Sequence, residues 1–144
     1  MSKSTLQLDF LYVVTNGKLS KYSSPLKEII YVEKGVSAEV LQAISKLLNW
    51  ELDLVANVVG VKKSSLLRKS TKLLNKKASE NAIEITKLSE FGSNYFGNID
   101  NWNHWLNIPH PNFEGQPPLR VIDKIRGREL IRGVIYGLKY GYTA

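Results

Sequence analysis

The stretch that decides the fold reads ELDLVANVVGVKKSSLLRK and runs from Glu51 to Lys69. Its first half repeats apolar residues at helical spacing, and Gly60 follows where a helix would end with a positive φ. Ala56 is small at a point where two helices must approach closely. A short basic segment with Leu66 as its inward anchor comes next. This order of helix, glycine turn and second helix predicts a helix-turn-helix.

Basic charge is concentrated in the same region. The 144-residue chain carries 20 Lys and Arg against 13 Asp and Glu, and no acidic residue occurs between Leu54 and Ser79. A block of one sign attracts polyanions by releasing their counterions, although a solvated helix face would have the same composition. Together with the helix-turn-helix spacing, the block favours DNA binding. The expected DNA-binding residues are Lys62, Lys63, Ser64, Ser65, Arg68 and Lys69.

Start and stop signals predict two helices before this region. Ser24 and Pro25 are typical of a helix start, and Gly35 of a helix end. Ser37 is expected to cap a second helix, whose apolar stripe is Val40, Leu41, Ile44, Leu47 and Leu48. Residues 1–23 give no clear pattern, because a strand-like alternation over 6–12 is interrupted by further apolar residues.

The second half of the chain also follows helical spacing. Asp100 is expected to cap a short helix that carries Trp102 and Trp105. Residues 107–118 are rich in Pro, Asn and Gly and predict a structured loop. Two helices with inward-facing apolar residues, Ile125 among them, are expected to follow, separated by Gly127. We therefore predict an all-α fold.

Composition and motifs exclude several classes of protein. Without Cys there is no disulfide and no thiolate zinc site, and no apolar run is long enough to cross a bilayer. The polar N-terminus lacks the features of a signal peptide, so we expect a cytoplasmic protein. His104 and His110 fit no metal-ligand spacing, and the common catalytic motifs are missing. We expect no enzyme, cofactor or metal site, with a small histidine-dependent enzyme as a weaker alternative.

Three groups of side chains have both a structural and a binding interpretation. The aromatic residues Trp102, Trp105 and Phe113 are typical of a core. The basic cluster around Gly127 (Arg126, Arg128 and Arg132) fits either a solvated face or contact with an acidic partner. The segment Tyr140–Ala144 combines aromatic anchors, a flexible Gly and a carboxylate, which suits insertion into a cleft; a frayed terminus is the alternative.

A further series of residues has a recognisable order. It comprises Trp105, Leu106, Pro109, Phe113-Glu114-Gly115-Gln116-Pro117-Pro118-Leu119, Gly127, Ile131, Ile135 and Leu138-Lys139-Tyr140-Gly141. This series resembles the Xre/MbcA/ParS-type antitoxins with a C-terminal toxin-binding domain, and Glu51–Lys69 resembles the divergent helix-turn-helix of that family. The resemblance implies that Trp105, Leu106, Pro109, Gly115, Pro118, Leu119 and Gly127 form a structural motif.

The resemblance also implies a function and a domain organisation. Such antitoxins neutralise a co-expressed toxin, most often a RES-domain protein that destroys NAD⁺, by plugging its cleft with their C-terminal region. Their helix-turn-helix part binds the promoter as a homodimer. We expect an uncertain segment at 1–23, a helix-turn-helix region at 24–76 and a toxin-binding domain at 77–144, the two halves packed together. The expected toxin-binding residues are Arg128, Arg132, Lys139, Tyr140, Gly141, Tyr142, Thr143 and Ala144. The alternative is a stand-alone transcriptional regulator whose C-terminal half only dimerises.

Overall fold

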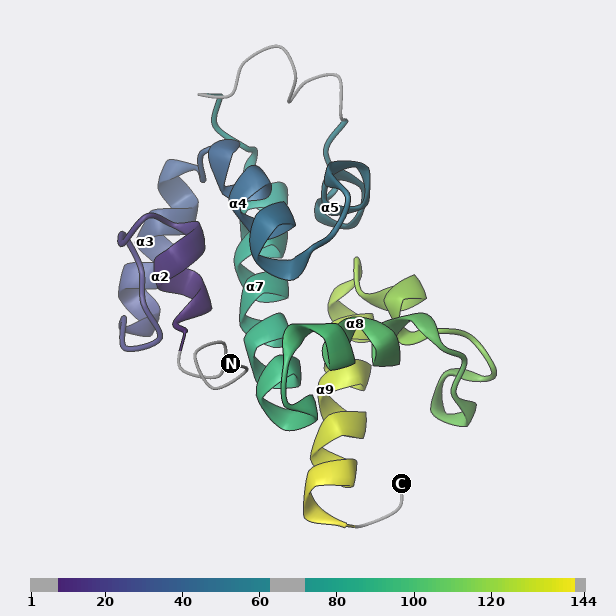
Figure 1. The fold of residues 1–144 in the computed structure, drawn as a ribbon. Helices are drawn as coiled ribbons and strands as arrows, with labels where there is room; N and C mark the ends of the chain where they lie inside the picture. The colour runs from purple at the N-terminus through teal and green to yellow at the C-terminus, as the bar shows by residue number, and fades with distance from the viewer. Residues whose placement is uncertain (1–7, 63–71, 142–144) are drawn as a thin grey trace. The chain divides into compact units, whose positions relative to one another are not determined.

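The computed structural model describes residues 8–62 and 72–141 of the chain (Figure 1). This part contains seven α-helices, two short 3₁₀ helices and no strand, which confirms the predicted all-α class. The elements are α2 (Phe10–Val14), α3 (Pro25–Lys34), α4 (Glu39–Leu48), α5 (Leu52–Val59), α7 (Lys76–Phe96), α8 (Ile99–Asn107), η1 (Pro111–Phe113), η2 (Pro118–Val121) and α9 (Ile125–Tyr140).

The chain divides into two compact units, with the boundary inside α7. The N-terminal unit comprises residues 8–87, and the C-terminal unit begins at Leu88. In the N-terminal unit, α4 packs against both α2 and α5. Four members of the predicted α4 stripe are buried and Leu47 is half-buried, so the apolar pattern located this core correctly.

Local capping fixes the ends of α3. The Ser24 hydroxyl accepts a hydrogen bond from the Lys27 backbone N–H at 3.1 Å, and Pro25 occupies the first helical position. Gly35 follows the helix with φ 92°. The predicted start and stop of this helix are therefore confirmed. Ser37 lies one residue before the N-cap of α4, and its hydroxyl accepts from the Glu39 N–H at 3.2 Å.

The strand-like alternation near the N-terminus proves to be misleading, because Phe10–Val14 form the short helix α2. The Asp9 carboxylate caps this helix by accepting from the Tyr12 N–H at 3.2 Å. It also accepts from the Lys21 N–H at 2.9 Å, which ties the following turn to the start of the helix. A side chain that caps a helix and anchors a turn outweighs a short local alternation.

The cap of α8 corrects a second expectation. Asn98, not Asp100, is the N-cap residue, and its side-chain oxygen accepts from the Asn101 N–H at 2.7 Å. Asp100 lies in the first turn, where its negative charge is still favourable beside the positive end of the helix dipole. Gly97, with φ 105°, separates α7 from this cap.

Candidate functional site

An aromatic cluster forms the centre of the C-terminal unit. Trp105 is only 7% exposed, and its ring lies 5.1 Å from the Phe96 ring and 5.9 Å from the rings of Trp102 and Phe113. Leu106 is fully buried beside it in sequence. Gly92 of α7 makes room for this cluster, because a Cβ there would lie 2.2 Å from the Trp102 ring. The expected core role of these aromatic residues is confirmed.

Replacing Trp105 with alanine is expected to destabilise the C-terminal unit by ~3–5 kcal/mol, because the change removes a buried indole and leaves a cavity. Chemical denaturation monitored by circular dichroism measures this loss. Trp105→Phe, which keeps a ring in the cluster, should lose markedly less. An alanine variant as stable as the parent protein would contradict the core assignment.

The loop after α8 is held by its own backbone. The Gly115 N–H donates to the His110 carbonyl at 3.0 Å, and Gly115 has φ 82°, which favours glycine. His110 Nε2 lies 3.2 Å from the Trp105 carbonyl, so this histidine joins the loop to α8, whereas His104 is exposed. The remaining motif residues of the loop differ in burial, with Pro109 exposed, Leu119 half-buried and Pro118 buried.

Gly127 permits the closest backbone approach in this unit. A Cβ at this position would lie 1.8 Å from the Val121 carbonyl oxygen, so only glycine fits. The expectation that Gly127 separates two helices is wrong, because it lies within the first turn of α9. A close contact with η2, and not a helix break, explains this glycine. Ile125, expected to face inward, is 65% exposed.

Arg128 is buried and therefore does not belong to the expected toxin-binding surface. The side chain is only 8% exposed, and Nη1 donates a hydrogen bond to the Ile122 carbonyl at 2.9 Å. Its guanidinium thus satisfies a backbone group at the end of η2 and does not stand at the rim of an exposed face. The pattern of charges could not reveal this, because a buried arginine and a surface arginine have the same helical spacing.

The other expected toxin-binding residues lie toward the end of α9. Arg132 is half-buried with its guanidinium carbon 4.8 Å from the centre of the Phe91 ring, whereas Lys139 and Tyr140 are exposed. Gly141 ends the helix in the left-handed conformation with φ 74°. Tyr142, Thr143 and Ala144 lie outside the described residues.

Helix α5 and the turn at Gly60 occupy the positions where the predicted helix-turn-helix would begin. Helix α5 ends at Gly60 with φ 97°, and the Asn81 side chain donates to the Val59 carbonyl at 3.0 Å beside this turn. Lys62 is exposed and lines a hollow together with Lys72. The other expected DNA-binding residues, Lys63, Ser64, Ser65, Arg68 and Lys69, lie outside the described residues.

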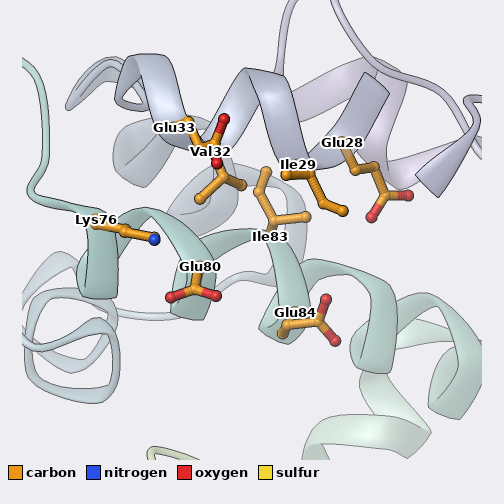
Figure 2. A pocket seen from close by; sticks show the side chains of 8 residues that line it. All are labelled: Glu28, Ile29, Val32, Glu33, Lys76, Glu80, Ile83 and Glu84. Atoms are coloured by element: carbon orange, nitrogen blue, oxygen red, sulfur yellow. The ribbon is translucent and has the colours of Figure 1, made fainter. Parts of the chain in front are cut away.

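A groove of about 210 Å³ in the same unit has the opposite charge (Figure 2). Ile29, Val32 and Ile83 form its apolar part between α3 and α7, and its charged lining residues are Glu28, Glu33, Lys76, Glu80 and Glu84. Lys87 pairs with Glu28 at 3.1 Å and lies 4.0 Å from Glu84, so four carboxylates meet two ammonium groups here. The remaining negative charge disfavours the binding of phosphate. On α3, burial raises the pKa of the Tyr31 hydroxyl.

The C-terminal part of the chain matches a known family. Residues 92–141 match the family model of the antitoxin Xre/MbcA/ParS C-terminal toxin-binding domain. The C-terminal part of the chain is therefore a toxin-binding domain of the Xre/MbcA/ParS antitoxin type. The matched family is that of a non-enzymatic toxin-binding domain, which implies a cognate toxin as the partner. A comparison with curated proteins finds no match.

Residues 8–62 and 72–141, the part of the chain that the structure describes, were searched for a metal-ion site and for a membrane-spanning helix. No group of three or more His, Asp or Glu side chains there is arranged to hold a metal ion. No helix there has the length and hydropathy needed to cross a membrane.

The four-residue spacing of Gly133, Gly137 and Gly141 favours close packing in a core. Gly137 is buried, but this expectation is wrong for Gly133, where a Cβ would have no atom within 4 Å.

Two further residues, Phe91 and Tyr136, were not expected to take part in the site. Phe91 lies under Arg132, and its ring centre is 5.1 Å from that of Tyr136. A signal was present, because Arg132, Tyr136 and Tyr140 are spaced four residues apart and must share a helix face.

Proposed function

We propose that this antitoxin neutralises a RES-type toxin that degrades NAD⁺, and that its C-terminal region occludes the toxin's active site in the cytoplasm. The observation that carries the proposal is the toxin-binding domain at residues 92–141, whose last helix presents Lys139 and Tyr140 to solvent next to the helix end at Gly141. A cleft that accepts NAD⁺ must receive aromatic rings and a pyrophosphate. Tyr142, in the segment beyond Gly141, supplies a ring of suitable size for such a cleft.

The test is the NAD⁺-consuming activity of the protein encoded beside the antitoxin, titrated with the full-length chain. Loss of activity at a fixed molar ratio supports the proposal. A neighbouring protein that consumes no NAD⁺ would overturn the RES assignment. A chain that binds promoter DNA but leaves the toxin active would instead be a stand-alone regulator.

We also propose that the antitoxin binds its own promoter as a homodimer. The support is the α5–Gly60 geometry, the exposed Lys62 and Lys72 on either side of residues 63–71, and the acid-free stretch between them. Backbone pairing fixes Lys72, because the Ala38 N–H donates to its carbonyl at 2.8 Å. Lys62 and Lys72 line one hollow, where they offer two cations to a DNA phosphate.

Exchanging Arg68 and Lys69 together for glutamine is expected to weaken promoter binding and to flatten its salt dependence. Each lost phosphate contact lowers the slope of log affinity against log salt by ~0.9. Fluorescence anisotropy at several salt concentrations measures both quantities. The control variant is Glu80→Gln, because Glu80 lies in the acidic groove and not in the basic segment. An unchanged slope would remove this segment from the DNA contact.

A further inference from the structure

One face of α9 is unusually aromatic for a solvent-exposed helix. The Tyr136 and Tyr140 rings stack at 6.0 Å with an interplanar angle of 8°, and Tyr136 in turn contacts Phe91 of α7. Arg132 covers the other side of this series through its contact with the Phe91 ring. Tyr136 is nevertheless 38% exposed and Tyr140 61%. The rings are thus ordered by their neighbours and still open to a partner.

Gly133 lies on the same face and has no structural reason to be glycine. A Cβ at this position would have no atom within 4 Å, whereas Gly92 and Gly127 of the same unit both face a close contact. Its backbone is helical, so it needs no positive φ. Glycine inside an exposed helix costs about 0.5–1 kcal/mol relative to alanine. A residue that lowers stability without a local contact is consistent with a close approach by another molecule.

We propose that the cognate toxin packs against α9 at Gly133, on the helix face that also carries Tyr136 and Tyr140; the open space that the missing side chain leaves at Gly133 is called the notch below. The proposal rests on the toxin-binding function of this domain and names the face that supplies its affinity. Two observations favour the toxin as the occupant. The face lies within the matched residues 92–141, and it continues to Gly141, where the proposed occluding segment begins.

The chemistry of the notch defines the partner surface that would fit it. Missing side-chain atoms at Gly133 allow a backbone or a small apolar side chain to approach the helix closely. The stacked tyrosines add apolar area with little loss of side-chain freedom, because their rings already hold each other. Arg132 and Lys139 are the cations nearest in sequence to these rings and favour carboxylates on the rim of the toxin surface.

The notch and the terminal segment therefore have separate roles. The α9 face supplies binding, and the segment beyond Gly141 supplies occlusion of the active site. A variant that blocks the notch should lose affinity but inhibit the toxin fully once it is bound.

The experiment measures the affinity of the full-length antitoxin for the product of the neighbouring reading frame by titration calorimetry, with Gly133→Gln as the test variant. Glutamine favours helix and has open space at this position, so the variant should unfold at no lower temperature than the parent. We expect Kd to rise at least about 30-fold, as for a central interface residue. The control Leu138→Gln, at an exposed position on another side of α9, should leave Kd unchanged.

Three results would overturn the proposal or separate it from the function proposed above. Equal affinity of the Gly133→Gln variant and the parent would exclude the notch as the toxin contact. A change of oligomeric state in light scattering, with toxin affinity unchanged, would assign the face to a second copy of the chain. Because binding is measured without any NAD⁺ assay, a toxin of another chemistry would overturn the RES assignment and leave the notch supported.

Discussion

Deletion of Tyr140–Ala144 is expected to abolish inhibition of the toxin while the rest of the antitoxin stays folded. The deleted residues come after the buried part of α9. Ile131 and Ile135 are fully buried, whereas Lys139 and Tyr140 are exposed. Their removal takes away the Tyr142 ring proposed to occupy the active site, together with Tyr140 of the α9 face proposed to bind the toxin. It takes little from the core. Toxin activity titrated with the full-length and shortened proteins measures the effect.

Two controls make this result interpretable. The melting temperature of the shortened antitoxin should lie close to that of the parent, and its promoter binding should be unchanged. Equal inhibition by both proteins would place the inhibitory surface elsewhere, and the loop over residues 107–116 would then be the first region to test.

Exchange of Gly127 for alanine is expected to be the most destabilising methyl addition in the C-terminal unit. The added Cβ would overlap the Val121 carbonyl oxygen, and a backbone atom cannot move aside as a flexible side chain can. We expect a loss above about 3 kcal/mol, beyond ordinary overpacking in a core. Urea unfolding followed by circular dichroism measures it.

Gly133→Ala is the matched control in the same helix. It adds the same methyl group where no atom lies within 4 Å, so it should raise the stability by about 0.5–1 kcal/mol. If both variants unfold at the same denaturant concentration, the close approach of η2 to Gly127 is not what selects glycine there.

The features predicted well from the sequence are those determined by near neighbours in the chain. The cap of α3 at Ser24, the ends at Gly35 and Gly60, and the buried stripe of α4 each depend on residues within a few positions of one another. Capping chemistry and helical periodicity act at this range, which is why local patterns were sufficient. The burial of Trp105 was also predicted, because a large aromatic residue is rarely left in water.

The expectations that proved wrong depend on contacts between separate elements. Gly127 looked like a helix break, but its role depends on a carbonyl six residues earlier in η2. Arg128 looked like a surface cation, but it bonds the Ile122 carbonyl of the preceding turn. The notch at Gly133 could not be derived either, because an exposed glycine and a tightly packed glycine look alike in a sequence.

We expect the chain to bind a cognate toxin through its C-terminal domain. The most direct test is co-expression with the product of the neighbouring reading frame, affinity purification through the antitoxin, and size-exclusion chromatography with light scattering. One stable complex that contains both proteins is the expected result. Elution of the antitoxin alone, with the neighbouring protein folded and present in the lysate, would contradict it.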